Sequence, residues 1–391
     1  MRTQVGIVGA GPAGLLLSHL LYRAGIESVV IEARSRDHVE QRQRAGVLEQ
    51  GTVETLIAAG VGERLQREGM VHEGIDFRFD GTAHRIDVKW LSGGRVVTVY
   101  AQTEIVRDLI AARVGDGGVI LFASEVIRID DIDGDTPVIR FRHDGSEHTL
   151  ACEYVAGCDG FRGVCRDAIP EGVLTTYRRD YPFAWLGILA EAPPGSHEVI
   201  YAYHDNGFAL QSMRSPRVSR LYLQCPLDDD AVDWSDDRIW SELHARLAAD
   251  GFALREGPIT QKAITGMRSF VVEPMQYGRM FLAGDAAHIV PPTGAKGLNA
   301  AVGDVRVLAA GFEEFYRRGK SDLLARYSDI ALRRIWKVER FAASLCTMLH
   351  RFDGDDAFTR RMQLADLAMI TSDPLAGMIY ANNYAGLPFE V

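Results

Sequence analysis

The sequence predicts a mixed α/β protein with a Rossmann-like dinucleotide-binding domain, a second domain built on a mostly antiparallel β-sheet, and C-terminal helices. Three observations predict this fold. A short β-branched strand at the N-terminus runs into a glycine-rich turn and a helix. Two strands far along the chain end in an aspartate beside a glycine, at Asp159 and Asp285. Between them, residues 218–226 alternate polar and apolar side chains, which is typical of an antiparallel strand with one polar face.

Composition excludes several classes of protein. Of the 391 residues, 47% are hydrophobic and 25% are charged, which are ordinary globular values and not those of a disordered or fibrous chain. The net charge of −10 is the opposite of what nucleic-acid binding favours. We expect neither a signal peptide nor a membrane span, because no long apolar run occurs. The 5 cysteines form no C-x-x-C pair, which indicates reduced thiols in a cytoplasmic protein without a metal site.

The N-terminal unit has every part of a dinucleotide-binding βαβ motif. The expected elements are a strand at Gln4–Val8, a helix at Leu15–Ala24 and a buried strand at Ser28–Ile31. In the G-x-G-x-x-G turn, Gly9 allows the tight bend, Gly11 lets the backbone reach a pyrophosphate, and Gly14 lets the helix pack on the strand. Glu32 ends the second strand, where a carboxylate accepts hydrogen bonds from a ribose. The motif alone does not distinguish FAD from NAD.

Two later segments favour FAD over NAD. The expected strands are Tyr154–Asp159 and Arg279–Asp285. After the second strand, a loop rich in proline and glycine at residues 291–299 opens a long helix. Asp285 would accept from a ribityl hydroxyl, and the helix start at Leu298 and Asn299 would face the pyrimidine edge of a flavin. These elements, in this order, predict a non-covalently bound FAD.

Longer stretches of the chain indicate a family. They are residues 44–51, 72–74, 181–187, 268–275, 288–299 and 383–388. With the glycine motif, Glu32 and the two strand-end aspartates, they resemble the single-component (class A) FAD-dependent aromatic hydroxylases almost end to end. The last three stretches are similar to one branch, whose substrate is 4-hydroxybenzoate. The resemblance implies a monooxygenase that forms 3,4-dihydroxybenzoate with dioxygen activated at FAD, using NADH or NADPH.

The predicted domains are discontinuous in sequence. We expect an FAD-binding domain at residues 1–73, 98–180 and 267–350, a substrate-binding domain at 74–97 and 181–266, and a helical segment at 351–391 that closes the active site. Apolar residues at intervals of three and four predict one long helix that Ser321 caps and that reaches His350.

The resemblance places the substrate carboxylate on an arginine. Arg214 would grip it with two parallel hydrogen bonds, because a guanidinium matches a carboxylate in shape and charge. Ser212 and Tyr222 would add hydroxyl contacts. On the residues alone, Arg217 and Arg220 are alternatives to Arg214, and the resemblance assigns Arg220 to the flavin side.

At the phenolic end, the resemblance implies a relay of protons. Tyr201 would bond the phenolic oxygen, Tyr384 would continue the chain of hydroxyls, and His72 would pass the proton towards solvent. Pro292 and Thr293 would line the substrate beside the flavin. Without the resemblance, the two tyrosines would be ordinary core residues and His72 a surface residue.

The resemblance also implies the cofactor contacts. Besides Gly9, Gly11, Gly14 and Glu32, the residues expected to hold FAD are Ala13, Arg42, Arg44, Val47, Gln102, Asp159, Arg220, Asp285, Leu298 and Asn299. Those expected to meet the nicotinamide nucleotide are Arg34, Arg36, His38 and Arg44. NADPH-using relatives have arginine, glutamine and tyrosine at positions 33, 34 and 38, whereas this chain has Ala33, Arg34 and His38. The preference between NADH and NADPH is therefore open.

Three alternatives are weaker on the sequence. They are a related hydroxylase acting on another phenolic acid, a flavoprotein without oxygenase activity, and a flavin-dependent sensor or binding protein. The first would keep the flavin motifs but lack the residues assigned to the two ends of the substrate. The partners expected are a small aromatic acid and dioxygen, with no nucleic acid and no membrane, and a homodimer is compatible with the sequence.

Overall fold

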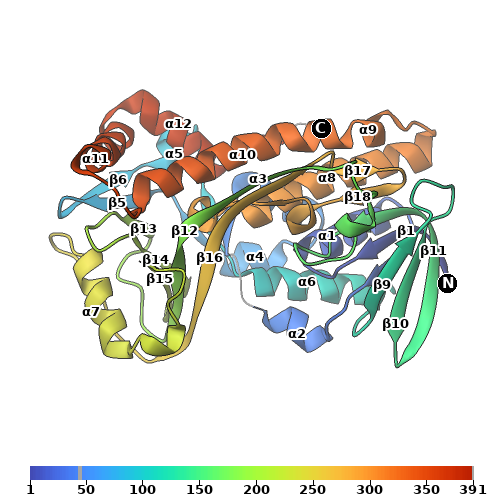
Figure 1. Ribbon diagram of the computed structural model, residues 1–391, viewed down its shortest axis with the longest axis horizontal. Helices are drawn as coiled ribbons and strands as arrows, with labels where there is room; N and C mark the ends of the chain where they lie inside the picture. Colours follow the sequence, from blue (N-terminus) through green and yellow to red (C-terminus); the bar gives the residue numbers. More distant parts are fainter. Residues whose placement is uncertain (43–45, 390–391) are drawn as a thin grey trace.

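The computed structural model describes residues 1–42 and 46–389 and has a large sheet at each end of an elongated molecule (Figure 1). The sheet near the N-terminus lies at one end, and helix α10 (Tyr327–Leu349) runs along one side towards the other. A small third sheet has the order β3-β7-β4. The predicted mixed α/β fold is confirmed.

The first sheet carries the parallel strands of the dinucleotide-binding unit. Its order is β17-β18-β11-β1-β2-β8, and β10 and β9 extend it from β11. Strands β18, β11, β1, β2 and β8 run parallel, so their carboxyl ends share one edge. Helix α1 packs between α6 and α8. The bounds are β1 (Arg2–Val8), β2 (Ser28–Ile31), β8 (Val119–Leu121), β9 (Glu125–Asp130), β10 (Val138–His143), β11 (Ser146–Gly157), β17 (Gln276–Tyr277), β18 (Met280–Leu282), α1 (Pro12–Arg23), α6 (Gln102–Gly115) and α8 (Gly297–Arg318).

The second sheet has the order β19-β16-β12-β15-β14-β13-β5-β6. Its bounds are β5 (Ile75–Phe79), β6 (Thr82–Ile86), β12 (Thr175–Ala190), β13 (Val199–Ala202), β14 (Ala209–Ser215), β15 (Val218–Cys225), β16 (Ile259–Glu273) and β19 (His288–Ile289). Strands β12 and β16 pair from Thr175 opposite Glu273 to Ala190 opposite Ile259. Both strands therefore run across the predicted boundaries near 180 and 266, and the domain division stays a prediction.

Alternation along these strands gives the second sheet two different faces. One face carries aliphatic residues such as Leu186 and Leu221 and packs against helix α7 (Asp236–Arg246). The other face carries aromatic residues, because Phe77, Tyr201 and Tyr222 lie in one row across neighbouring strands. Because α7 covers the aliphatic face, the aromatic face is the one on which a site can form.

The remaining elements connect and cover the two sheets. They are β3 (Val47–Glu49), β4 (Met70–His72), β7 (Val97–Val99), α2 (Arg36–Gln41), α3 (Gln50–Ala58), α4 (Glu63–Glu68), α5 (Val88–Leu91), α9 (Asp322–Ala325), α11 (Ala357–Ser372) and α12 (Pro374–Ala385). The prediction of one helix capped by Ser321 is wrong. Helices α9 and α10 are separate, and the Ser321 side chain makes no capping bond among the described residues.

The predicted absences concern membranes and metals. No helix among the described residues is long and apolar enough to cross a membrane. In the same part of the chain, no group of three or more histidine, cysteine or acidic side chains is placed to hold a metal ion. All 5 cysteines are buried thiols.

A fully buried histidine supports the aromatic face of the second sheet. The Trp185 indole N–H donates to Nε2 of His350 at 2.7 Å, and Nδ1 of His350 contacts the Cys346 carbonyl oxygen at 3.0 Å. The imidazole is therefore neutral with its proton on Nδ1. It stacks on Phe183, with ring centres 4.4 Å apart. Burial lowers the pKa of His350 from about 6.5 to about 3.

We expect His350 to make the fold sensitive to acid. The unfolded chain binds the imidazole proton below about pH 6.5 and the folded protein only near pH 3, so stability falls as pH falls through this range. Between pH 7 and 5 the loss from this group is about 2 kcal/mol. Urea unfolding at pH 7 and pH 5 measures this loss. The difference in unfolding free energy between the two pH values should be smaller in His350→Gln than in wild type by that amount. The exposed His148→Gln should keep the wild-type difference, and an unchanged difference in His350→Gln would contradict the assignment.

Candidate functional site

The loop after β1 forms a cradle for a phosphate. Gly9 has a φ of +102°, and a Cβ there would lie 2.4 Å from the Cys158 carbonyl oxygen. A Cβ on Gly14 would lie 2.0 Å from the Gly9 carbonyl oxygen, so α1 packs directly on the loop. By contrast, a Cβ on Gly11 would meet nothing within 4 Å. No described side chain caps the start of α1, so its first N–H groups are available to an anion.

Glu32 lies beside this cradle at the end of β2. Its Oε2 accepts from the Ala10 N–H at 2.7 Å and its Oε1 from the Arg34 N–H at 2.8 Å. These bonds fix the orientation of the carboxylate. Because a carboxylate has about four acceptor positions, it can still accept from ribose hydroxyls.

Asp159 and Asp285 follow β11 and β18 at the same sheet edge. One oxygen of Asp159 accepts a backbone N–H at 2.9 Å, and the other is buried without a hydrogen-bond partner among the described residues. The turn at Asp285 is held by a residue that the sequence did not single out, Asp304 of α8. Its Oδ2 accepts from the Gly284 N–H at 2.9 Å and lies 2.7 Å from Nε2 of His288.

These parts fit FAD. A Cβ on Gly284 would lie 3.7 Å from the Cβ of Ala13, so the first and third predicted motifs meet in space. Together they present a helix N-terminus for a pyrophosphate and carboxylates for ribose or ribityl hydroxyls. Gln102 starts α6, and Arg42 is exposed at the end of α2. Arg44 lies outside the described residues.

The start of α8 is positioned by Asn299. Its side-chain amide donates to the carbonyl oxygens of Val47 at 3.1 Å and Ala295 at 2.8 Å, and its Oδ1 accepts from the Glu49 N–H at 2.9 Å. All its strong hydrogen-bonding groups are thus used within the protein. The groups of Leu298 and Asn299 that can face a flavin are their backbone N–H groups, since no described side chain caps this helix.

Behind this loop lies a buried ion triad that was not predicted. Lys296 Nζ donates to Oε1 of Glu49 at 2.7 Å, and Arg334 donates to Oε2 of Glu49 at 2.9 Å. Lys296 also donates to the carbonyl oxygens of Asn383 and Tyr384. When Lys296 and Arg334 are both protonated, these two cations and the Glu49 carboxylate have a net charge of +1 beside the start of α8. The sequence signal was a single lysine inside a loop otherwise rich in glycine and proline.

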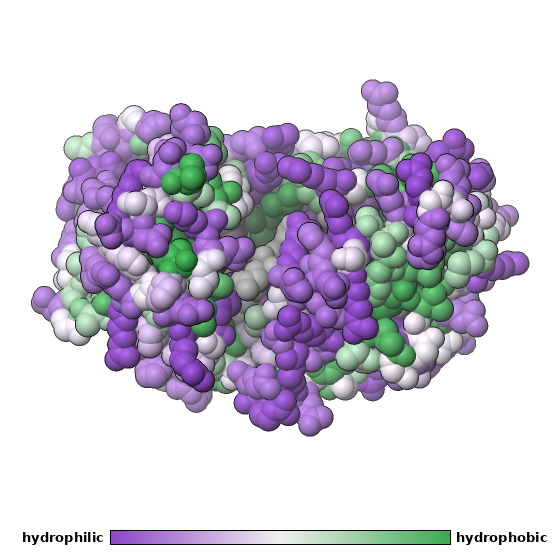
Figure 2. All heavy atoms as spheres, turned by 90° about the horizontal axis from the view of Figure 1, so that it is seen from below, coloured by the Kyte–Doolittle hydropathy of each residue, from purple (hydrophilic) through white to green (hydrophobic). Residues whose placement is uncertain are grey.

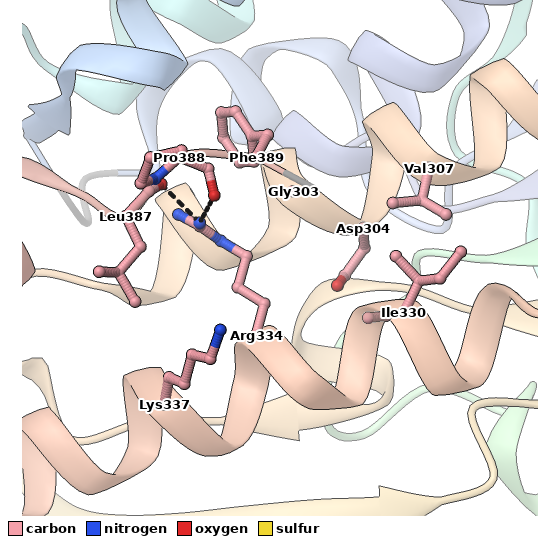
Figure 3. A pocket seen from close by; sticks show the side chains of 10 residues that line it. Gly303, Asp304, Val307, Ile330, Arg334, Lys337, Leu387, Pro388 and Phe389 are labelled. Atoms are coloured by element: carbon pink, nitrogen blue, oxygen red, sulfur yellow. Dashed lines mark hydrogen bonds between the residues drawn. The ribbon is translucent and has the colours of Figure 1, made fainter. Parts of the chain in front are cut away.

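Figure 3 shows Arg334 reaching from α10 to the chain that follows α12. Its guanidinium donates to the carbonyl oxygens of Leu387 at 2.7 Å and Pro388 at 3.3 Å. It also lies 4.4 Å from the centre of the Phe389 ring. The triad therefore fastens the end of the described chain to α8 and α10, and with it the last turn of α12.

The residues expected at the substrate carboxylate share the aromatic face of the second sheet. Ser212 lies directly opposite Arg220 in the β14–β15 register, and Tyr222 follows two residues along β15. The Ser212 hydroxyl is buried without a hydrogen-bond partner among the described residues. The Arg220 guanidinium lies over the Tyr222 ring at 4.8 Å.

The Arg214 guanidinium packs inside the protein, against the chain that leads into β3. A Cβ on Gly46 would lie 2.2 Å from its Nη1, so its guanidinium packs on the chain before β3. Burial lowers the pKa of Arg214, and Arg220 lowers it further while Tyr222 opposes the shift. The alternative, Arg217, is exposed in the turn between β14 and β15.

The other end of this face carries the predicted tyrosines. Tyr201 of β13 is buried, and its hydroxyl donates to the Thr293 carbonyl oxygen. Tyr384 of α12 is also buried and interacts electrostatically with Tyr201. Burial raises the pKa of both hydroxyls, so both keep their protons near neutrality and can donate hydrogen bonds. Pro292, one residue before Thr293, is exposed.

His72 is a buried residue and not a surface one. It ends β4, and only 1% of it is exposed. Neither ring nitrogen has a hydrogen-bond partner among the described residues. Burial lowers its pKa to about 4, while the charge of Glu198 opposes the shift. The imidazole is therefore neutral at pH 7, with room for one donated and one accepted hydrogen bond.

The residues expected to meet the nicotinamide nucleotide lie on and before α2. Arg34, Arg36 and His38 are all exposed. Arg36 pairs with Glu40 one turn later at 2.6 Å. Figure 2 shows one face of the molecule, which is hollowed near its middle and has apolar side chains on part of the wall of the hollow.

The chain is similar in sequence to known proteins. A family model described as FAD binding domain matches residues 2–342. The chain is 45% identical to the p-hydroxybenzoate hydroxylase of Acinetobacter baylyi, over 100% of this chain and 97% of that protein. It is 25% identical to a probable NADH-specific resorcinol 4-hydroxylase of Rhodococcus jostii, over 78% of this chain and 58% of that protein.

Solved structures have the same fold. The p-nitrophenol 4-monooxygenase of Pseudomonas putida superposes with a TM-score of 0.85 at 20% identity, covering 99% of both chains. An aklavinone-11 hydroxylase in complex with FAD and aklavinone gives a TM-score of 0.75 at 22% identity, over 89% of this chain and 69% of that one. At these identities the likeness concerns the fold alone.

The open space at Gly11 gives a test of the cofactor cradle. Gly11→Ala should leave the apoprotein as stable as wild type, because its φ of −71° suits any residue and the new Cβ meets nothing. It should weaken FAD binding at least about tenfold, since the methyl group would occupy the place of the pyrophosphate. Gly14→Ala is the matched control and should destabilise the apoprotein itself. Urea unfolding and flavin fluorescence measure the two effects, and a Gly11→Ala variant with wild-type FAD affinity contradicts the placement.

Proposed function

Because the chain belongs to the FAD-dependent aromatic hydroxylases, enzymes whose cofactor is FAD, we propose that it acts as a 4-hydroxybenzoate 3-monooxygenase. The substrate in this proposal is 4-hydroxybenzoate, and the co-substrates are dioxygen and a reduced nicotinamide nucleotide. One observation carries it. The Arg214 guanidinium, which interacts with Tyr222 and Arg220, lies towards one end of a sheet face whose other end has the Tyr201 hydroxyl. A ring with a carboxylate and a hydroxyl in para positions matches both ends.

At the carboxylate end, orientation is the task of the protein. Arg214 donates two parallel hydrogen bonds, and the partnerless Ser212 hydroxyl gains an acceptor. Arg214 is four residues along β14 from Leu210, which lies opposite Tyr201. At about 3.3 Å per residue, the two backbone positions are about 13 Å apart along the strand. The gap between the two functional groups is smaller, because the long side chains of Arg214 and Tyr201 extend into it. The ring is thereby held in one direction.

At the phenolic end, the task is to stabilise the phenolate, since the reaction needs an electron-rich ring. The Tyr201 hydroxyl turns from the Thr293 carbonyl to the phenolic oxygen and donates to it. The proton leaves in a relay: the phenol gives its proton to the Tyr201 oxygen, Tyr201 gives its own to Tyr384, and Tyr384 gives its own towards the neutral ring of His72. The proton that Tyr201 then holds is the one it donates to the phenolate. The low pKa of His72 means that the proton does not stay there and passes to solvent.

Bound FAD supplies the redox chemistry, taking reducing equivalents from the nicotinamide and activating dioxygen. The residues that hold it in this proposal are the glycines of the first turn, Glu32, Asp159, Asp285 and the backbone at Leu298. The net charge of the triad at Lys296 favours negative charge near the start of α8. Pro292 and the chain after it separate this region from solvent beside the ring.

A second copy of the chain is proposed to cover an apolar surface on the C-terminal helices. Large exposed apolar side chains gather on α5, α11 and α12, which pack on one another: Trp90, Phe358, Met362, Met369, Leu375, Met378 and Ile379. Exposed apolar side chains that gather in this way are typical of interaction surfaces, and a symmetric dimer would bury them on both copies. Sedimentation velocity distinguishes the dimer from a monomer.

Turnover tests the proposed substrate. We expect 4-hydroxybenzoate to stimulate oxygen uptake with a reduced nicotinamide and to yield 3,4-dihydroxybenzoate in equal amount. Arg214→Ala should raise the dissociation constant for 4-hydroxybenzoate at least about 30-fold, because truncating a buried charge pair leaves the partner unpaired. The exposed Arg217→Ala is the matched control and should bind as wild type does. Flavin absorbance reports binding, and equal affinity in Arg214→Ala would overturn its role.

We expect shallow discrimination between the coenzymes. Arg34 is exposed and Arg36 is engaged by Glu40, so a 2′-phosphate gains one solvent-screened contact, worth less than about tenfold. Both NADH and NADPH should reduce the flavin, with NADH at least comparable. Arg34→Ala should lower kcat/KM for NADPH and leave that for NADH nearly unchanged. A wild-type preference for NADPH above about 100-fold would show that another cation binds the phosphate.

A further inference from the structure

A third tyrosine lies against the Tyr201–Tyr384 pair. Tyr380 is on α12, one turn before Tyr384, and only 4% of it is exposed. Its hydroxyl is buried and has no hydrogen-bond partner among the described residues. Its position in the sequence does not distinguish it from a core residue of α12.

The rings of this cluster fix where the Tyr380 hydroxyl lies. The Tyr380 and Tyr384 rings are stacked, with centres 5.7 Å apart and planes 16° from parallel. Phe77 packs edge-on against both Tyr380 and Tyr201, at 5.2 and 5.7 Å between ring centres. Phe341 closes the far side of Tyr380 at 5.6 Å. Two stacked tyrosines one helical turn apart extend in similar directions, and Tyr380 interacts electrostatically with both Tyr201 and Tyr384.

A buried hydroxyl without a partner is costly and therefore informative. Leaving such a group unpaired is less favourable than replacing it by an apolar group of the same shape. Phenylalanine would keep every ring contact of Tyr380 and avoid that cost. The hydroxyl is thus explained if it gains a partner that enters with the ligand.

We propose that Tyr380 supplies a third hydroxyl to the group that stabilises the substrate phenolate, hydrogen-bonding to the Tyr201–Tyr384 pair directly or through one water. This rests on the proposed function. When Tyr201 turns to the phenolic oxygen, Tyr384 must donate to Tyr201, and Tyr384 then needs a donor of its own. Tyr380 is the hydroxyl placed to provide it. Hydrogen bonds arranged in series polarise one another, so the third bond strengthens the first.

Other ionisable groups face this cluster and set the background of the measurement. Tyr222 and Cys346 interact with Tyr201, and Glu198 interacts with Tyr384. Tyr380 itself interacts with Tyr201 and Tyr384. A change at Tyr380 alone leaves all the outer groups in place, so a shift in the ionisation of the bound substrate reports on this hydroxyl.

The test is the apparent pKa of 4-hydroxybenzoate bound to the oxidised holoenzyme, read from phenolate absorbance as a function of pH. In Tyr380→Phe we expect it to rise by about 0.4–1 pH unit, the equivalent of one lost hydrogen bond. The thermal midpoint of substrate-free Tyr380→Phe should equal or exceed that of wild type. Tyr380→Leu, which removes the ring as well, should shift the pKa in the same direction.

Tyr203→Phe is the matched control. Tyr203 is buried in the same aromatic cluster, but its hydroxyl donates to Gln363 at 3.0 Å, away from the pair. It should lower stability and leave the substrate pKa unchanged. A folded Tyr380→Phe that binds the substrate with the wild-type pKa would overturn the role of Tyr380 alone. A wild type that binds no phenolate form would overturn the proposed function, and this inference with it.

Discussion

The geometry of the site depends on one buried carboxylate, that of Glu49. It holds Lys296 at the start of α8 and Arg334 on α10, and both cations also bind carbonyl oxygens of the chain at and after the end of α12. Removing the Glu49 carboxylate would leave the charges of Lys296 and Arg334 uncompensated, at a cost of about 3–5 kcal/mol. The same three side chains contact both the loop beside the flavin region and the helix that carries Tyr384. They therefore fix the position of the proposed flavin site relative to the proposed proton path.

The second constraint is the pair of long strands, β12 and β16. They run from the dinucleotide-binding end of the molecule into the second sheet and so connect the cofactor cradle to the substrate face. Along β12, Trp185 lies against Tyr222 and is held by His350 at the end of α10. A long-range hydrogen bond thus supports the substrate face. The proposed site therefore lies where two sheets, α8, α10 and α12 meet, and no single element contains it.

Local patterns predicted the parts that depend on local chemistry. The turn at Gly9, the strand at Ser28–Ile31 and the alternation around Tyr222 all follow from steric limits or from periodicity, and the structure has them. The sequence could not show that the Asn299 side chain bonds to Val47 and Glu49, or that Glu49 pairs with two cations, because these partners lie hundreds of residues apart in the chain. Nor could it show that His72 is buried, since that depends on the tertiary fold. The break between α9 and α10 was hidden for another reason. The helical spacing of apolar residues continues through the break, although the helix itself is interrupted at Arg326.

The central claim is that Tyr201 links the substrate hydroxyl to a proton path that ends at His72. The measurement that tests it most directly is the ratio of 3,4-dihydroxybenzoate formed to oxygen consumed by Tyr201→Phe. This variant keeps the ring and loses only the hydroxyl that now donates to Thr293. We predict that it still binds 4-hydroxybenzoate and still reduces its flavin, but forms hydrogen peroxide in place of much of the product. Hydroxylation by Tyr201→Phe with the wild-type ratio of product to oxygen would contradict the claim.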